Sequence, residues 1–309
     1  MINGIINIYK EQGFTSFDVI AKLRGILKQK KIGHTGTLDP DAVGVLPVCL
    51  GSATKLCDML TDKTKEYIAE FIMGQTTDTQ DSSGTVLEEH PVNCTQEQVR
   101  ECVMEFIGLQ SQIPPMYSAI KINGKKLYEL AREGKEVERK AREITIYELE
   151  VLSVKLPHVK IRVKCSKGTY IRTLCYDIGQ KLCCGATMTF LERTQSGMFT
   201  KENALTLTQV EELRDSGELL THILPVDFAF MGYPEIIVSG EILKKVLNGN
   251  LILKKEWQQC CQQDYANTDG TLYRIYKQTD NRKTFLATYE YNAEKKGFKP
   301  NKMFLEQEG

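Results

Sequence analysis

The sequence predicts an α+β protein with a small β-rich part at its C-terminal end. Segments in which apolar residues alternate with polar ones, a pattern typical of strands, occur along the chain between amphipathic helical segments. The content of 41% hydrophobic and 26% charged residues is ordinary for a globular protein, and 309 residues suffice for a large domain with a small one. Towards the C-terminus the apolar segments are short, as in Arg274–Tyr276 and Thr284–Tyr291.

The composition excludes several classes of protein. The 40 basic and 40 acidic residues balance, so an argument for nucleic-acid binding must rest on local charge. There is no run of roughly 18 apolar residues, which excludes a membrane-spanning helix. The ten cysteines show no Cys-x-x-Cys pair or His-flanked spacing. With no signal peptide, this usage predicts reduced thiols in a cytoplasmic protein without a metal site.

The first predicted elements are a strand and a basic helix. Residues 2 to 9 read as a short strand, and Thr15 or Ser16 caps the helix that follows. The apolar stripe of this helix is Phe17, Ile20, Leu23 and Leu27. Residues 19 to 31 contain five basic residues and no acidic one. We interpret this segment as contacting phosphates, and the alternative is a solvated helix face.

The stretch from residue 33 to 50, GHTGTLDPDAVGVLPVCL, is the most informative in the chain. Glycines relax the backbone around one acid, Asp39, and Pro40 restricts the conformation of that acid. Val43–Leu50 then reads as a buried strand. A phosphate-binding loop is disfavoured because no Lys follows the glycines. A tight turn and an active-site loop remain equally compatible with the spacing.

The next segments alternate between helices and strands. Ser52–Leu60 predicts a helix, and Glu66–Gly74 predicts a strand with Tyr67, Ala69, Phe71 and Met73 on one face. Residues 74 to 84 form a polar loop, where Asp78 and Asp81 do not fit the spacing of an ion-binding loop. We therefore expect a structural loop near the site. A capping box at Thr95–Gln98 begins a helix that stops at Gly108.

A basic segment interrupts the second half of this pattern. Residues 121 to 142 hold eight basic residues and four acidic ones, which indicates a protruding insertion or, alternatively, a solvated charged hairpin. Strands at Ile144–Val154 and Val159–Cys165 follow. The second strand leads into a helix from about Tyr170, which places Tyr170 and Arg172 at a helix N-terminus suited to an anion or a ligand. Another strand covers about Thr187–Gln195.

Several blocks, in order, resemble the TruB family of tRNA pseudouridine-55 synthases. The blocks are GTLDP within residues 33 to 50, NIYKEQGFTS at 7 to 16, KEY to GQTTDTQDSSG at 65 to 84, QIPPMYSAIK to YELAREG at 112 to 134, CSKGTYIRTLCYDI at 165 to 178, and CGATMTFLERTQSGMF at 184 to 199. The resemblance covers about residues 1 to 230. It implies the pseudouridine synthase fold, a mixed, mainly antiparallel sheet flanked by helices.

The resemblance also implies a domain organisation. Residues 1 to 232 are expected to form the catalytic domain, with an insertion at about 120 to 143 that folds over the T arm of tRNA. Residues 236 to 309 are expected to form a small C-terminal domain, and Ile236–Leu253 resembles the start of a PUA-type RNA-binding domain.

Particular residues match the functional positions of this family. Asp39 matches the nucleophile, which acts at C1′ or C6 or assists loss of the C2′ proton, and Arg172 is expected to pair with it and lower its pKa. Tyr67 is expected to stack on the target base and His34 to meet the flipped nucleotides. Tyr170 and Leu191 match positions that line the uracil pocket, although a core position explains Leu191 almost equally well. The isomerisation needs no cofactor.

The function predicted by this resemblance is conversion of uridine 55 in the tRNA T-loop to pseudouridine, by a monomer without an obligate protein partner. Two alternatives remain open: a protein that binds and refolds tRNA, and a guide-dependent relative that acts on ribosomal RNA. The intact set of Asp39, Tyr67 and Arg172 favours an enzyme over a refolding protein. The basic insertion favours a standalone enzyme over a guide-dependent one.

Overall fold

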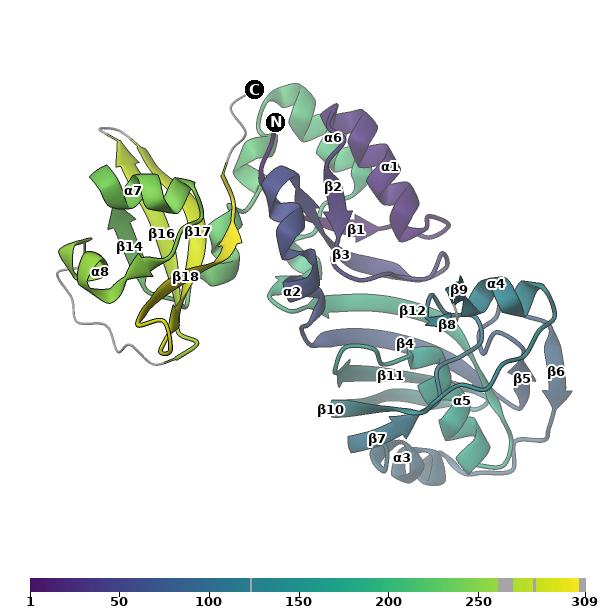
Figure 1. Cartoon of the computed structure of the whole chain (residues 1–309). Coiled ribbons are helices and arrows are strands. Elements are labelled where there is room, and N and C mark those ends of the chain that lie inside the picture. Colours follow the sequence, from purple (N-terminus) through teal and green to yellow (C-terminus); the bar gives the residue numbers. More distant parts are fainter. Residues whose placement is uncertain (123, 261–268, 280–281, 306–309) are drawn as a thin grey trace.

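The computed structural model describes residues 1–122, 124–260, 269–279 and 282–305. In this part of the chain, a nine-stranded sheet has the strand order β1-β3-β12-β4-β11-β10-β7, with β2 paired to β3 and β13 paired to β12. A five-stranded sheet has the order β14-β16-β17-β18-β15. Figure 1 shows the smaller sheet, with α7 and α8, as a separate lobe next to the N-terminal end of the chain.

The strands of the large sheet are β1 (Gly4–Lys10), β2 (Ile32–His34), β3 (Val43–Leu50), β4 (Lys65–Met73), β7 (Gly108–Gln112), β10 (Arg142–Lys155), β11 (His158–Cys165), β12 (Ala186–Ser196) and β13 (Phe199–Thr200). The small sheet contains β14 (Glu235–Val238), β15 (Ile252–Leu253), β16 (Leu272–Thr279), β17 (Arg282–Asn292) and β18 (Gly297–Met303). Two hairpins are formed by β5 (Gln75–Thr77) with β6 (Val86–Glu89) and by β8 (Lys121–Ile122) with β9 (Lys125–Lys126).

The α-helices are α1 (Ser16–Leu27), α2 (Cys57–Thr61), α3 (Gln96–Met104), α4 (Leu127–Arg132), α5 (Ile171–Lys181), α6 (Leu207–Ser216), α7 (Gly240–Leu247) and α8 (Lys254–Cys260). Short 3-10 helices are η1 (Gly51–Leu56), η2 (Lys201–Asn203), η3 (Leu219–His222) and η4 (Val226–Phe230). No helix of the described residues is long and apolar enough to cross a membrane.

The large sheet is mixed and mainly antiparallel, as predicted. β12 pairs with β3 in parallel over a short register, Glu192 opposite Val43 and Arg193 opposite Gly44, while β4 pairs with β12 along almost its whole length in antiparallel fashion. Gly44 permits the close approach of β12, because a Cβ atom there would lie 2.2 Å from the carbonyl oxygen of Arg193. A short paired segment between β3 and β12 therefore connects the two parts of the sheet, and we call this segment the narrow junction.

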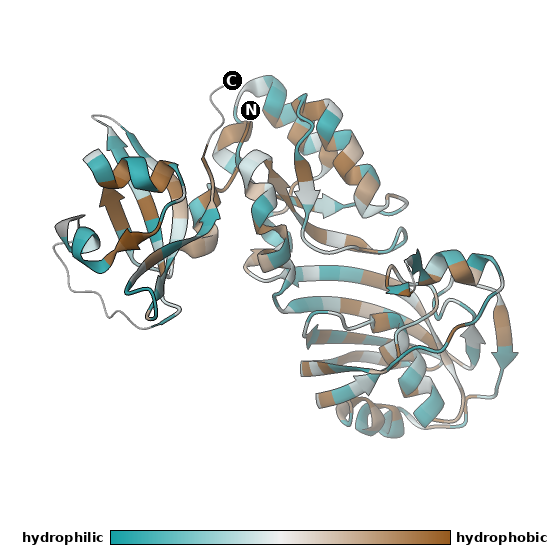
Figure 2. Cartoon of the chain, in the orientation of Figure 1, coloured by the Kyte–Doolittle hydropathy of each residue, from teal (hydrophilic) through white to brown (hydrophobic). Residues whose placement is uncertain are grey.

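Two hydrophobic cores flank this junction. One core lies under α1 and α6 and includes apolar residues of β1 and β3, and the other lies under α3 and α5 and includes β4, β10, β11 and β12. Burial alternates strictly along β4, so that Tyr67, Ala69, Phe71 and Met73 share the buried face that the sequence predicted. Figure 2 shows the same alternation of hydropathy along strands of the large sheet. The strand that follows the Asp39 loop, β3, is buried throughout.

Some predicted details are wrong. Phe17 does not belong to the buried stripe of α1: its side chain is 64% exposed, and Val19 and Ile26 are buried with Ile20 and Leu23 instead. The helix after Thr95 ends at Met104, well before Gly108, because β7 begins at that glycine. The segment 52–60 is a 3-10 helix followed by a short α-helix. The polar loop at 74–84 includes strand β5.

The small sheet has its own core and a second cluster that joins it to the large sheet. Trp257 stacks on Phe298 at 3.8 Å between ring centroids inside the small lobe. Phe285 and Phe304, from the small lobe, pack with Phe230 of η4 and with Ile5 and other residues of the large sheet. The ring centroids of both lie 5.9 Å from that of Phe230. This aromatic cluster is the main apolar contact that connects the two lobes.

Candidate active site

The loop that carries Asp39 lies at the narrow junction of the large sheet and is held by hydrogen bonds with Ser16 and Lys10. The Ser16 hydroxyl, which is buried, accepts a hydrogen bond from the Leu38 amide at 2.9 Å. The Lys10 ammonium donates to the carbonyl oxygens of Pro40 at 2.9 Å and Phe14 at 2.5 Å. Burial lowers the pKa of Lys10 to about 8, although the Asp39 charge opposes this shift. These contacts fix the backbone on both sides of the carboxylate.

Arg172 faces Asp39 from the first turn of α5. Its Nε lies 3.0 Å from Asp39 Oδ2, which is the ion pair that the resemblance predicted. The remaining guanidinium nitrogens donate to the main-chain oxygens of Thr79 at 2.9 Å and Tyr117 at 2.8 Å. The side chain is only 5% exposed. The guanidinium is therefore locked in place by contacts that do not depend on Asp39.

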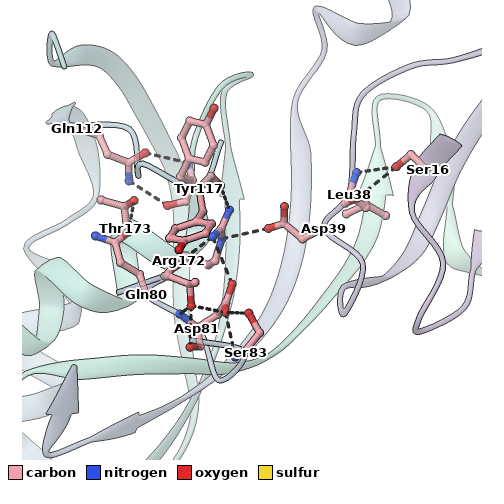
Figure 3. A network of polar contacts seen from close by, with 12 residues as sticks. Ser16, Leu38, Asp39, Gln80, Asp81, Ser83, Gln112, Tyr117, Arg172 and Thr173 are labelled. Atoms are coloured by element: carbon pink, nitrogen blue, oxygen red, sulfur yellow. Dashed lines mark hydrogen bonds and ion pairs between the residues drawn. The ribbon is translucent and has the colours of Figure 1, made fainter. Parts of the chain in front are cut away.

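Asp81 is a second carboxylate on the same guanidinium. Its Oδ2 lies 3.3 Å from Arg172 Nη1, and its Oδ1 accepts from the Thr79 hydroxyl at 2.7 Å and from the Ser83 amide at 3.1 Å. Figure 3 shows Asp39 and Asp81 meeting Arg172 from different directions. The predicted structural loop near the site is confirmed, because Thr79 and Asp81 in this loop bind Arg172, the cation that pairs with Asp39.

The net electrostatic effect on Asp39 differs from the prediction. Arg172 lowers the pKa of Asp39 as expected, but burial raises it by more and Asp81 raises it further, so that the pKa of Asp39 lies above its usual value. The Asp39 side chain still keeps 42% of its surface exposed. The carboxylate is therefore partly desolvated but in contact with water in the free protein.

Tyr67 lies opposite Arg193 in the register of β4 and β12. The Tyr67 side chain is 9% exposed and packs in the core cluster with Leu38, which directly precedes Asp39. Burial raises the pKa of Tyr67, and the Arg193 guanidinium beside its hydroxyl opposes that rise. The Asp39 charge adds to the rise in the pKa of this phenol.

Three further predicted residues surround this centre. Tyr170 is the N-cap of α5, where Gln112 accepts from its amide at 2.8 Å and donates to its carbonyl at 3.0 Å. Leu191 is 7% exposed and belongs to the core cluster that contains Tyr67, so both interpretations of this residue persist. His34 ends β2, and its buried Nδ1 has no hydrogen-bond partner among the described residues. Burial and the nearby Arg193 charge lower the pKa of His34.

Sequence reasoning missed Lys10, Arg193 and the role of Asp81. Lys10 and Arg193 stand in strands, where a basic residue is ordinarily taken to face solvent, and only the tertiary packing buries them. Asp81 was considered only as a metal ligand. Among the described residues no group of three or more His, Cys, Asp or Glu side chains is arranged to hold a metal ion.

Two family models match the chain. One, described as "TruB family pseudouridylate synthase (N terminal domain)", matches residues 24–171. The other, described as "tRNA pseudouridylate synthase B C-terminal domain", matches residues 172–231. The two matches meet between Ile171 and Arg172, so they contain between them both residues of the Asp39–Arg172 ion pair.

Curated relatives and solved structures give a consistent picture. The "tRNA pseudouridine synthase B" of Lachnoclostridium phytofermentans is 52% identical, covering 98% of this chain and 100% of the relative. The protein of the same name from Clostridium novyi is 48% identical, with the same coverage of 98% and 100%. The structure described as "Crystal Structure of a Cbf5-Nop10-Gar1 Complex" superposes with a TM-score of 0.68 at 26% identity, over 98% of this chain and 85% of the other. A structure described as "Structure of H/ACA RNP bound to a substrate RNA containing 2'-deoxyuridine" has the same TM-score of 0.68 at 24% identity, over 99% of this chain and 86% of the other, and shares the fold.

Proposed function

The chain belongs to the TruB family of pseudouridylate synthases, and from this premise we propose that it isomerises uridine 55 in the T-loop of tRNA to pseudouridine. The observation that carries the proposal is the ion pair of Asp39 with Arg172, 3.0 Å between Oδ2 and Nε, at the junction of the large sheet. The relatives named for tRNA pseudouridine synthesis share about half of this chain's residues over nearly its whole length.

The reaction explains why these residue types meet. It breaks the bond between C1′ and N1, turns the uracil and joins C5 to C1′, so nothing is oxidised, no group is imported and no cofactor is needed. A carboxylate is required to act at C1′ or C6 or to assist loss of the C2′ proton. Asp39 supplies it. Arg172, which stays charged in any surroundings, keeps that carboxylate ionised when the base covers it.

The partial exposure of Asp39 fits this role. In the free protein the carboxylate retains contact with water, and a uracil that enters the site displaces that water. Desolvation then makes the carboxylate more reactive, while the ion pair with the preplaced guanidinium opposes its protonation. Because Thr79, Tyr117 and Asp81 already hold Arg172, little reorganisation is needed when the substrate arrives.

The remaining residues bind the everted nucleotide. Extruding a stacked base costs a few kcal/mol, and stacking on an aromatic ring offsets part of that cost. In this proposal Tyr67 stacks on the uracil, Tyr170 and Leu191 line its pocket, and the half-buried His34 meets the flipped nucleotides.

Recognition of the T arm belongs to the basic insertion, residues 120 to 143, and to the basic segment of α1. The insertion contains β8, β9 and α4, and Figure 1 shows these elements together at one side of the large sheet. We assign residues 1 to 232 to the catalytic domain and residues 236 to 309 to a small PUA-like domain. The protein acts on tRNA as a cytoplasmic monomer without an obligate protein partner.

The shared fold is compatible with the guide-dependent alternative. Chains of the solved complexes named for Cbf5 and for an H/ACA RNP superpose on nearly the whole of this chain. Sequence identity weighs against it: 24 to 26% with those chains but 48 to 52% with the relatives named for tRNA.

The test compares tritium release from tRNA labelled at C5 of uridine by the wild-type protein and by Asp39→Asn, which keeps the shape and removes the charge. We expect one equivalent of release with the wild type and none with Asp39→Asn, while tRNA binding is preserved. Asp41→Asn, an exposed carboxylate in the same motif, is the matched control and should release tritium normally. Binding without release in the wild type would identify a tRNA-refolding protein instead.

A further inference from the structure

Arg193 is a buried cation without an acidic partner. Its side chain is 1% exposed and is among the largest fully buried side chains of the protein. Within the described ranges no carboxylate lies within ion-pair distance of it; Asp39 and Asp81 both pair with Arg172. Burying an uncompensated charge costs several kcal/mol unless fixed dipoles solvate it.

The contacts of Arg193 tie together the segments that form the site. Its Nε donates to the carbonyl oxygen of Val45 at 2.7 Å, and Nη2 donates to that of Gly36 at 3.2 Å. Val45 belongs to β3, and Gly36 lies in the loop between His34 and Asp39. The guanidinium therefore crosses the narrow junction between β12 and β3 and supports the start of the Asp39 loop at Gly36.

A phenol lies across the strand pair from Arg193. Tyr67 stands directly opposite Arg193 in the antiparallel register, and directly opposite residues project to the same face of a sheet. The Arg193 charge lowers the pKa of the Tyr67 hydroxyl, against the rise caused by burial. The same charge also lowers the pKa values of His34, Lys10 and Lys65, because it repels their protonated forms.

We propose that Arg193 is a positioning residue that orients the Tyr67 phenol and polarises its hydroxyl for the isomerisation. This inference rests on the proposed function. A guanidinium held across the strand pair from the phenol draws electron density from its oxygen, which makes the O–H a better hydrogen-bond donor towards the everted base. The ring is then held in the plane in which it stacks, by a partner that is itself fixed to β3 and to the Asp39 loop.

A double-mutant cycle tests this coupling. Arg193→Lys keeps the charge and loses the fork of donors, and Tyr67→Phe keeps the ring and loses the hydroxyl. If Arg193 acts through that hydroxyl, Arg193→Lys lowers the single-turnover rate by about 10-fold or more in the wild-type background and by less than about 2-fold in the Tyr67→Phe background. tRNA affinity stays the same in all four proteins. Equal losses of rate in both backgrounds would show a merely structural role and overturn the proposal.

Lys65 provides the matched control. It is another buried cation, 6% exposed, on the strand that carries Tyr67, and its ammonium donates to main-chain oxygens of Thr61 and Lys63. We expect any loss of rate in Lys65→Met to be the same with Tyr67 and with Tyr67→Phe. A coupling as large as that of Arg193 would mean that the cycle reports general loosening of β4, and the assignment to Arg193 would fail.

A second readout does not depend on activity. With 3-fluorotyrosine placed at position 67 alone, the ¹⁹F signal reports ionisation of this phenol in the free protein. Replacing Arg193 by Met removes the cation, so the titration midpoint should move to higher pH, and Arg193→Lys should move it less. An unchanged midpoint in Arg193→Met would overturn the inference even if tritium release proves the function. A shifted midpoint without release would instead leave the contact standing and refute the proposed function.

Discussion

At the scale of single residues, Arg172 does more than balance the charge of Asp39. Its guanidinium also binds Asp81 and the main-chain oxygens of Thr79 and Tyr117. A lysine ammonium could not satisfy partners in so many directions, since it lacks the planar fork of donors. The cation is therefore fixed before Asp39 acts, and the carboxylate, with 42% of its surface exposed, is the freer member of the pair.

The raised pKa of Asp39 predicts that removing its charge stabilises the folded protein, although the charge is needed for activity. Because burial raises this pKa in the folded state, the folded protein binds the proton more tightly than the unfolded chain does, and stability falls as the pH rises through the folded-state pKa. Asp39→Asn should therefore raise the melting temperature at pH 7. The carboxylate is 42% exposed, so solvent screening limits the gain to about 1 °C.

The pH dependence of this effect provides its check. Calorimetric melting temperatures of the wild type and Asp39→Asn should converge as the pH falls below the unfolded-state pKa, where both side chains are neutral. A variant that melts below the wild type at pH 7 would mean that the ion pair with Arg172 outweighs desolvation. Asp215→Asn, which changes an exposed carboxylate paired with Arg214, is the control and should not raise the melting temperature.

How much of the site the sequence could predict depends on the kind of residue. Asp39 and its pairing with Arg172 followed from a motif with strong family resemblance. The net pKa of Asp39 did not, because it depends on burial and on Asp81, which a loop 42 positions away in the sequence brings to the same guanidinium. Lys10 and Arg193 could not be found, since their burial is decided by which strands become neighbours.

At the scale of elements, the insertion is a small hairpin and helix with a charged surface. Lys125 pairs with Glu133 at 3.6 Å, and the Lys126 ammonium donates to the Tyr128 hydroxyl at 3.0 Å. Arg132 lies over the Tyr128 ring, 5.4 Å from its centroid. These contacts are exposed and weak, so the basic groups can exchange them for phosphates at little cost.

Neutralising Lys125, Lys126 and Arg132 together should weaken tRNA binding and leave the chemistry intact. Each lost phosphate contact reduces the slope of log K against log salt by about 0.7 to 0.9, so a triple Gln variant should lose about 2 units of slope. Binding titrations at several salt concentrations measure this, and the single-turnover rate at saturating enzyme should stay within about 2-fold.

A control with the same change of charge is available on β11. Lys160, Arg162 and Lys164 pair with Glu70, Glu150 and Glu148 on an exposed face of the large sheet. Replacing these three by Gln should leave the salt slope unchanged. If both triple variants flatten the slope equally, the effect reflects net charge, and the insertion has no special part in binding.

Strands were predicted better than helices in this chain, for a physical reason. Burial on one face of β4 imposes a period of two, which the sequence shows directly, whereas α1 is covered unevenly and leaves Phe17 in solvent. The end of α3 was misplaced because the sequence pattern stays compatible with a helix up to Gly108. After Met104 the backbone forms tighter turns, with Phe106 bonded to Val103 and Ile107 to Met104, before β7 pairs with β10 from Gly108.

At the scale of the whole molecule, the two lobes share the aromatic cluster of Phe230, Phe285 and Phe304. Polar contacts supplement it: the Lys55 ammonium donates to the Met303 carbonyl at 2.6 Å, and the Tyr276 hydroxyl donates to Asp227 at a distance of 2.6 Å. The sequence predicted a small β-rich part near the C-terminus from short apolar segments, but the strands there, β16 and β17, are longer than those segments. The cluster was not predicted, since Phe230 and Phe304 come from segments without a periodic pattern.

Phe230→Ala should uncouple the two lobes. Truncating a buried Phe costs about 3–5 kcal/mol, and here the loss falls on the contact between the lobes. Differential scanning calorimetry should then resolve two transitions, the earlier one from the small lobe. Phe71→Ala, a truncation of equal size inside the core of the large lobe, should lower the transition of that lobe instead. One unsplit transition in Phe230→Ala would show that the polar contacts suffice to couple the lobes.

The position of β12 in the large sheet has a consequence for biosynthesis. β12 lies between β3 and β4, yet it is made long after both. At about 5–20 residues per second, roughly 10 to 30 s separate the synthesis of Asp39 from that of Arg193 on the ribosome. During this interval β3 and β4 lack their shared neighbour, and their exposed edges are sites for aggregation or for chaperone binding. We expect nascent chains that end before β12 to associate with chaperones, and the Asp39 loop to become ordered only when the strand bearing Arg193 inserts.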